Sequence, residues 1–397
     1  MKRLKYFIFA FFTICQITGF SQEWNLVWEK DFGRNNKTSF IDVIADISGG
    51  YTLLGTSENE KTGIVETWLS RFNESGDTIW NRYYSFPNPA SPKCLVQASD
   101  KGYLMALSLL SDEEENRQIM LIRTDSDGNE LWVKKMNNAI SCSGGKMASL
   151  GDGGFIFAGS KIEEPEFQEL WLLKINSEGE TIWEKTYTED DITTGKSIKL
   201  LPDGGFAVAS TVVKKGFNNS DIWILRTDEN GEVIWSSRIP GKDTKAWPEC
   251  VCCSPDNHLM VVGWHGTAFG DINAEEVIID YDLWIGKFAQ DGKLLWSKNI
   301  DSEGSEGGNN ITMRPDGNFL IAGKKETSFS GKVGPWLIYI DAEGNMLNEH
   351  LIKFHHYNDM ATKIINAPDS GFVVIGPGIQ ADENIRSFAW IMKYKSF

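Results

Sequence analysis

The chain has 397 residues, with 55 acidic and 39 basic side chains and a formal net charge of −16. This acidic balance argues against nucleic acid and anionic membrane surfaces as partners, because both are bound through basic patches. Cations, basic proteins and neutral glycans remain compatible with it, and so does a charge that only keeps the protein soluble.

The N-terminal segment has the pattern of a secretory signal peptide. A basic start is followed by a short apolar run over residues 6–14, and Gly19-Phe20-Ser21 places small residues before a cut ahead of Gln22. We expect residues 1–21 to be removed and the mature chain, with a net charge of −19, to be periplasmic or extracellular. Lipoprotein anchoring at Cys15 is not expected, because Thr13-Ile14 offers no small residue before it. No later segment is apolar and long enough to span a membrane. We expect the mature protein to be a monomer.

Two columns of tryptophan recur along the chain. The first recurs at intervals of 52, 52, 51, 52 and 61 residues, with Asn348 in the next position, and comprises Trp28, Trp80, Trp132, Trp183, Trp235 and Trp296. The second has Met120 in its one gap and comprises Trp68, Trp171, Trp223, Trp284, Trp336 and Trp390. A period near 50 residues with several strand patterns per unit is typical of a β-propeller.

Each unit is predicted to contain four strands. An inner strand such as residues 196–201 leads through a tight turn such as Asp152-Gly153-Gly154, where glycine supplies positive φ, into an apolar second strand. A third strand carries a tryptophan of the second column. After a turn such as residues 176–179, an outer strand ends in a tryptophan of the first column.

Seven units account for the whole mature chain. The apolar second strands are centred on Tyr51, Tyr103, Phe155, Phe206, Leu259, Phe319 and Phe372. The chain starts with a lone outer-type strand at residues 24–31 and finishes on a third-type strand at residues 389–395. We therefore predict an all-β, seven-bladed propeller with four-stranded antiparallel blades over residues 22–397. Its N-terminal strand would complete the last blade and close the ring, which removes exposed sheet edges.

The motif Asp-Gly-Gly-aromatic-x-x-x-Gly, followed by Trp-x4-Asp-x-x-Gly-x3-Trp, resembles the repeats of secreted bacterial β-propeller proteins. It is also similar to WD40-like propellers and, distantly, to the tryptophan-docked repeats of quinoprotein-type propellers. The resemblance covers residues 22–397. It implies a ring around a central channel, with ligand sites on the face that bears two sets of loops: those from each outer strand to the next inner strand, and those between second and third strands. No catalytic motif of these families matches, so the resemblance implies no catalytic residue.

The fifth unit departs from the others. From Gly263 to Trp284 it has 21 residues, where the other six units have 12 to 14 at the same place. Two tryptophans outside the columns belong to it, with Trp247 expected in the loop before the inner strand and Trp264 at the end of the second strand. Together with His265 they are candidates for an aromatic platform that stacks a sugar ring or a flat ligand. The alternative is that both tryptophans pack beneath the longer loop.

The inserted segment, residues 265–282, is acidic. Asp271, Glu275, Glu276, Asp280 and Asp282 offer oxygen ligands of the kind that calcium prefers, and we count Asp271 as a candidate ligand-binding residue. The segment lacks the spacing of a calcium loop, so a solvated acidic loop is the alternative, and no metal or cofactor site is assigned. The C-x-C-C pattern of residues 250–253 lacks the gap of a zinc site. The mature cysteines are Cys94, Cys142, Cys250, Cys252 and Cys253, an odd number that does not indicate a disulfide framework.

One polar column is predicted to face the central channel. It lies nine residues before the second-strand core and comprises Asp42, Cys94, Lys146, Ser197, Cys250, Asn310 and Lys363. The next column is apolar in all seven units. Asp42, Lys146, Asn310 and Lys363 are the candidates for holding a small axial ligand, and a water-filled polar channel is the alternative.

Support for catalysis is thin. His355 and His356, with Tyr357 and Asp359 nearby, fall in a loop on the expected ligand face, but nothing fixes a partner for them. We therefore expect a binding or scaffold module for a protein or a carbohydrate. The alternative is a glycan lyase or hydrolase, or a quinoprotein-like oxidoreductase, that uses the loop face or the channel.

Overall fold

The computed structural model contains only β-strands in the part of the chain that it describes. It describes residues 24–33, 37–110, 117–136, 141–164, 167–214, 219–241, 244–269, 278–301, 304–326, 333–352, 359–381 and 385–395. The predicted signal peptide, Asp271 and the pair His355–His356 lie outside these residues. Within the described ranges, no helix long and apolar enough to cross a membrane occurs.

The 28 strands form four-stranded antiparallel blades, as the repeat predicts. The first four blades comprise β2 (Thr38–Ala45), β3 (Tyr51–Glu58), β4 (Val65–Phe72) and β5 (Thr78–Tyr84); β6 (Ala90–Gln97), β7 (Tyr103–Leu110), β8 (Arg117–Thr124) and β9 (Glu130–Met136); β10 (Ser141–Ser149), β11 (Phe155–Glu164), β12 (Phe167–Ile175) and β13 (Thr181–Tyr187); and β14 (Ile192–Leu200), β15 (Phe206–Val213), β16 (Asp221–Thr227) and β17 (Val233–Ile239). The last three comprise β18 (Ala246–Cys253), β19 (Leu259–Phe269), β20 (Ile278–Phe288) and β21 (Leu294–Ile300); β22 (Glu306–Met313), β23 (Phe319–Glu326), β24 (Val333–Ile340) and β25 (Met346–Leu351); and β26 (Lys363–Asn366), β27 (Phe372–Ala381), β28 (Ile385–Tyr394) and β1 (Leu26–Phe32). A single parallel bridge between Gln168 and Ile192 joins blades three and four into one eight-stranded sheet.

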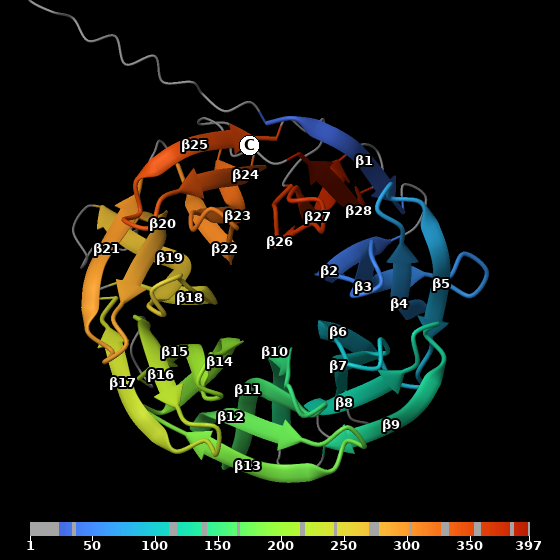
Figure 1. Ribbon diagram of the computed structural model, residues 1–397, viewed down its shortest axis with the longest axis horizontal. Coiled ribbons are helices and arrows are strands. Elements are labelled where there is room, and N and C mark those ends of the chain that lie inside the picture. The colour runs from blue at the N-terminus through green and yellow to red at the C-terminus, as the bar shows by residue number, and fades with distance from the viewer. Residues whose placement is uncertain are drawn as a thin grey trace, which may run out of the picture.

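The blades are arranged around a common centre (Figure 1). The first strand of each blade lies nearest the centre and the fourth lies at the perimeter. The N-terminal strand β1 pairs antiparallel with β28, with Trp28 opposite Lys393 and Asp31 opposite Trp390. The first and last strands of the chain therefore share blade seven, as the sequence predicts.

The first tryptophan column joins consecutive blades. Trp132 of blade two lies on Gly179 in the last turn of blade three, and a Cβ added there would lie 2.6 Å from the ring. The same contact, at 2.5–3.0 Å, pairs Trp28 with Gly76, Trp80 with Gly128, Trp183 with Gly231, Trp235 with Gly292 and Trp296 with Gly344. Each of these glycines has positive φ, between 72° and 86°. Only glycine adopts this left-handed backbone conformation without strain and also leaves room for the tryptophan ring, because it has no side chain.

The docking pattern explains why Asn348 takes the place of a seventh tryptophan. A tryptophan on β25 would need a turn between the third and outer strands of blade seven. There the two strands are β28 and β1, the opposite ends of the chain, and no such turn connects them. Trp24 lies near this place instead and stacks on His350, with ring centroids 5.4 Å apart.

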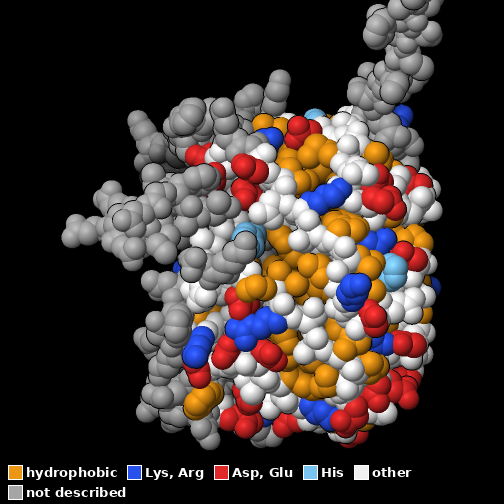
Figure 2. All heavy atoms as spheres, turned by 90° about the vertical axis from the view of Figure 1, so that its left-hand side faces the viewer, with side chains coloured by type: hydrophobic (Ala, Val, Ile, Leu, Met, Phe, Trp, Pro, Cys, Tyr) orange, Lys and Arg blue, Asp and Glu red, His pale blue; other side chains and the backbone are white. Residues whose placement is uncertain are grey.

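The outer strands pack on one side only. The residue before each position of the first column is a large aliphatic side chain that is 45–57% exposed: Val27, Ile79, Leu131, Ile182, Ile234, Leu295 and Leu347. Figure 2 shows apolar side chains among charged ones on the outer wall, where β21 and β25 lie. The second tryptophan column points inward and is at most 5% exposed, so the apolar cores lie between the blades.

Candidate functional site

The polar column lines one cavity at the centre of the ring. This axial cavity has a volume of about 130 Å³ and is lined by Asp42, Cys94, Leu95, Lys146, Met147, Ser197, Ile198, Glu249, Cys250, Val251, Asn309, Asn310, Thr362 and Lys363. All seven members of the column are among them. The adjacent apolar column is at most 8% exposed, as predicted. The structure therefore brings Asp42, Lys146, Asn310 and Lys363 together.

A β-bulge in the inner strands turns the column toward the axis. The register shifts just before the column in six blades, for example between Pro248 and Cys250 in blade five. The bulge brings the inner backbone close to the second strand, so that a Cβ at Gly263 would lie 1.9 Å from the carbonyl oxygen of Trp247. Bulges re-aim side chains in this way at functional and structural sites alike.

Most members of the polar column accept a hydrogen bond from the backbone of the next blade, a contact that we call an inter-blade clasp. The Oδ2 atom of Asp42 accepts the backbone N–H of Leu95 at 3.0 Å. Ser197 Oγ accepts the N–H of Val251 at 3.2 Å, and Asn310 Oδ1 accepts that of Ile364 at 3.0 Å. The thiol of Cys94 takes the same role toward Met147. These hydrogen bonds give the column a structural role, because they join neighbouring blades. The sequence did not reveal this role, since it depends on which blades are neighbours in space.

Opposite charges meet where the last blade joins the first. The Lys363 ammonium forms an ion pair with Oδ1 of Asp42, which also accepts the N–H of Val43 at 2.9 Å. Burial alone would raise the pKa of Asp42, but the charges of Lys363 and Lys146 and the hydrogen bonds outweigh it and lower the pKa. Both carboxylate oxygens of Asp42 therefore already have hydrogen-bond or ion-pair partners within the protein.

Burial and neighbouring charges also shift the pKa values of Lys146, Cys94 and Glu249 in the axial cavity. Burial tends to lower the pKa of Lys146, but Asp42 and the other acidic groups nearby outweigh it and raise that pKa. Burial raises the pKa of the Cys94 thiol to about 12. Burial also raises the pKa of Glu249, whose carboxylate lies 3.9 Å from the ammonium of Lys196.

The second candidate region is blade five, where Trp247 and Trp264 lie directly opposite one another on β18 and β19. Trp247 thus belongs to the inner strand rather than to a loop, and Trp264 lies inside β19 rather than at its end. His265, as the next residue along the strand, points to the other face of the sheet. The structure does not group it with the two tryptophans; it lies opposite Asp282.

The two tryptophans have different surroundings. Trp264 packs on blade six, because a Cβ at Gly307 would lie 2.3 Å from its ring and the Lys324 ammonium lies 4.2 Å from its ring centroid. Burial lowers the pKa of Lys324. Trp247 forms a tilted pair with Tyr281, with centroids 5.3 Å apart, and both rings are half-buried. All three rings are half-buried. Trp264 packs against blade six, so the candidate ligand platform in blade five is the pair Trp247–Tyr281.

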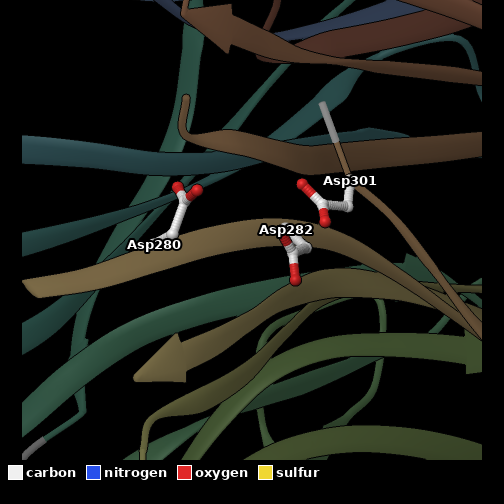
Figure 3. Close-up of side chains that lie close together, drawn as sticks. All are labelled: Asp280, Asp282 and Asp301. Atoms are coloured by element: carbon white, nitrogen blue, oxygen red, sulfur yellow. The ribbon is translucent and has the colours of Figure 1, made fainter. Parts of the chain in front are cut away.

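The insertion of blade five lengthens a hairpin. The sequence suggests a loop over residues 265–282, but β19 and β20 are 11 residues long and pair as far as Phe269 and Ile278. Asp280 and Asp282 on β20 lie with Asp301 so that one oxygen of each is within 4.8 Å of the others (Figure 3). Asp301, which sequence reasoning missed, lies beside Asp282 because Ile300 pairs with Leu283.

The acidic cluster also has protein partners. Ser305 Oγ donates to Asp280 at 3.3 Å, and the amide of Asn299 donates to Asp282 at 3.5 Å. Calcium commonly takes six to eight oxygen ligands, more than these three side chains supply. Among the described residues this is the one group of three potential metal ligands, and the cysteines near His258 are not part of it. The four cysteines whose side chains are described, Cys94, Cys250, Cys252 and Cys253, are free.

Comparison with known proteins identifies the fold. No protein-family model matches the chain, and no curated protein matches it in sequence. Polysaccharide lyase Uly1 is similar at a TM-score of 0.57 and 11% identity, covering 96% of this chain and 94% of its own. The WD40 domain of Neurospora crassa Pan2 is similar at 0.52 and 8% identity over 88% of each chain. Puromycin hydrolase is similar at 0.53 and 12% identity over 89% of this chain, which spans about half (52%) of that protein's length. At such identities the likeness concerns the fold alone: the chain is a β-propeller.

Proposed function

We propose that this β-propeller is a non-catalytic binding module and that it holds a glycan against Trp247 and Tyr281 of blade five. The observation that carries the proposal is this half-exposed aromatic pair, with rings tilted by 34° and an adjacent cation, Lys245, 6.0 Å from the ring of Trp247. Flat aromatic faces with a few polar neighbours are the usual platform for sugar rings.

The repeat supports a special role for this pair. Where blade five has Trp247 opposite Trp264, blades one to four have pairs of small hydroxyl residues: Ser39–Thr56, Ser91–Ser108, Ser143–Ser160 and Thr194–Thr211. Gly307 and Lys324 in blade six accommodate Trp264. That packing accounts for Trp264 but leaves Trp247 and Tyr281 without an equivalent structural task.

The chemistry of the axial cavity supports binding over catalysis. A general acid or base works best with a pKa near the operating pH. The pKa of Asp42 is lowered, that of Lys146 is raised and that of Cys94 is about 12, so these three lie away from neutrality. Burial shifts the pKa of Glu249 in the opposite direction, toward neutrality, but its carboxylate faces the ammonium of Lys196 at 3.9 Å. The similarity to a polysaccharide lyase concerns the fold and transfers no activity.

The proposal includes the maturation of the chain. Residues 1–21 would be removed and residues 22–397 would form one closed, monomeric propeller in the periplasm or outside the cell, repeating the pattern of secreted bacterial, quinoprotein-like propellers. The pairing of β1 with β28 and the ion pair between Lys363 and Asp42 support closure, because both join the two ends of the chain. Mass spectrometry of the secreted protein should give Gln22 as its first residue, and light scattering should give one chain.

Titration calorimetry with a panel of neutral and acidic polysaccharides tests the binding role. Trp247→Ala and Tyr281→Ala should each weaken binding about two- to twelvefold, as expected for the loss of roughly 0.5–1.5 kcal/mol of ring stacking. Tyr83→Ala is the matched control, because Tyr83 is a 52% exposed tyrosine on β5 of blade one. Unchanged affinity in both blade-five variants would refute the site. Shortening of a polysaccharide by the wild-type protein would establish the enzymatic alternative instead.

A further inference from the structure

Two inter-blade junctions of the axial cavity lack the acceptor of an inter-blade clasp in the described part of the chain. Between blades five and six the Cys250 thiol contacts the carbonyl oxygen of Ile311 at 3.8 Å instead, and between blades three and four a lysine stands in the column. In blades one, two, four and six the column residue accepts the backbone N–H of the adjacent apolar column in the next blade. Two blades have lysine in the column, Lys146 in blade three and Lys363 in blade seven. A lysine ammonium has three donors and no acceptor, so neither lysine can form this clasp.

The junction of blades seven and one shows how the chain solves this problem. There a carboxylate oxygen of Asp42 receives both the Lys363 ammonium and the N–H of Val43, which belongs to the apolar column. One carboxylate thus joins the lysine of one blade to the backbone of the next. Asp42 is only 1% exposed, so this arrangement is built into the structure.

The junction of blades three and four has the same parts except the carboxylate. Lys146 occupies the position of Lys363, Ile198 occupies that of Val43, and Ser197 stands where Asp42 would be needed. Among the described residues Lys146 has no hydrogen bond and no ion pair within 4.0 Å. Asp42, the thiols of Cys94 and Cys250, and Glu249 act on its charge from further away. Asp42 is already paired with Lys363, and Glu249 lies 3.9 Å from Lys196.

We propose that the axial cavity binds a small carboxylate between Lys146 and the backbone N–H of Ile198. The bound carboxylate replaces, at this junction, the Asp42 side chain that lies between Lys363 and the N–H of Val43 at the junction of blades seven and one. The hydroxyl hydrogen of Ser197 is a third donor to it, since the oxygen of Ser197 already accepts from Val251. The volume of about 130 Å³ far exceeds the roughly 10–15 Å³ that one water requires, and it suits an acid of a few heavy atoms.

This site lies on the axis and does not depend on the glycan platform of blade five. Titration of acetate and propionate into the protein, at constant ionic strength in chloride, should give saturable binding to one site, and chloride or sulfate alone should not. Lys146→Met should weaken acetate binding at least tenfold, because a charge-assisted hydrogen bond is lost. Lys199→Met, on the exposed face of the same strand β14, should bind as the wild type does.

A second variant tests the idea in the opposite direction. Ser197→Asp installs the carboxylate that blade one has, so it should abolish acetate binding and raise the melting temperature of the free protein. Acetate binding that survives both Lys146→Met and Ser197→Asp would overturn the proposal. So would a wild-type protein that binds neither acetate nor propionate at millimolar concentrations, or a Ser197→Asp protein that melts at a lower temperature.

Discussion

The docking of Trp132 on Gly179 predicts a stability loss that can be separated into two causes. Gly179 has a φ of 74°, and an alanine Cβ there would lie 2.6–3.0 Å from three atoms of the Trp132 ring. The left-handed backbone alone costs an L-residue about 1–2 kcal/mol. Displacing a packed ring adds about 1–3 kcal/mol. Gly179→Ala should therefore lower the free energy of unfolding by about 2–5 kcal/mol.

Gly63→Ala supplies the matched control, because Gly63 has a φ of 69° and nothing within 4 Å of an added Cβ. Its free energy of unfolding should fall only by the cost of the left-handed backbone, about 1–2 kcal/mol. A further control, Gly151→Ala, also has open space around the Cβ and no positive φ, and it should change stability little. Urea unfolding followed by circular dichroism and tryptophan fluorescence measures all three. If Gly179→Ala and Gly63→Ala lost equal stability, the ring contact between blades would have no energetic role.

Two other predictions concern the axial cavity. Asp42→Asn should cost about 3 kcal/mol at pH 7, in the range for a broken buried ion pair. Because the pKa of Asp42 is lowered in the folded state, this stabilisation is present above the unfolded pKa of about 3.9 and is lost as the pH falls through the lower folded value. Unfolding experiments at pH 7, 5 and 3 should show the difference in stability between wild type and Asp42→Asn becoming smaller. A difference that stays constant over that range would contradict the role of Asp42. Cys94, 1% exposed with a pKa of about 12, should resist alkylation at pH 8 until urea unfolds the protein, and rapid labelling of the native state would show that the cavity opens.

The repeat was predictable because its signals are local and recur. A turn such as residues 176–179 needs glycine at its end whatever the rest of the chain does, and apolar side chains recur at fixed distances from it. The polar column beside an apolar one indicated the axis correctly, since every member of both columns lies where that pattern places it. These features depend on strand periodicity alone.

Blade five was predicted less well. The polar composition of residues 265–282 suggested a loop, but backbone pairing tolerates polar side chains, and the hairpin continues to Phe269 and Ile278. The alternation of a strand then placed His265 away from Trp247 and brought Tyr281 to it. Asp301 joined Asp280 and Asp282 through the register of β20 and β21, which could have been counted from the turn at Gly292.

The sequence by itself determined the all-β class, the four-stranded repeat, the blade that departs from it and the residues that face the axis. Each of these follows from spacing along one chain. The tertiary structure decided which residues of different blades meet: Trp132 with Gly179, Trp264 with Gly307, and Lys363 with Asp42. It also decided that Lys146 meets no acceptor of its own among the residues that the structure describes. Such contacts join residues roughly 40 to 320 positions apart, and they depend on the order and packing of the blades around the axis, which no local pattern encodes.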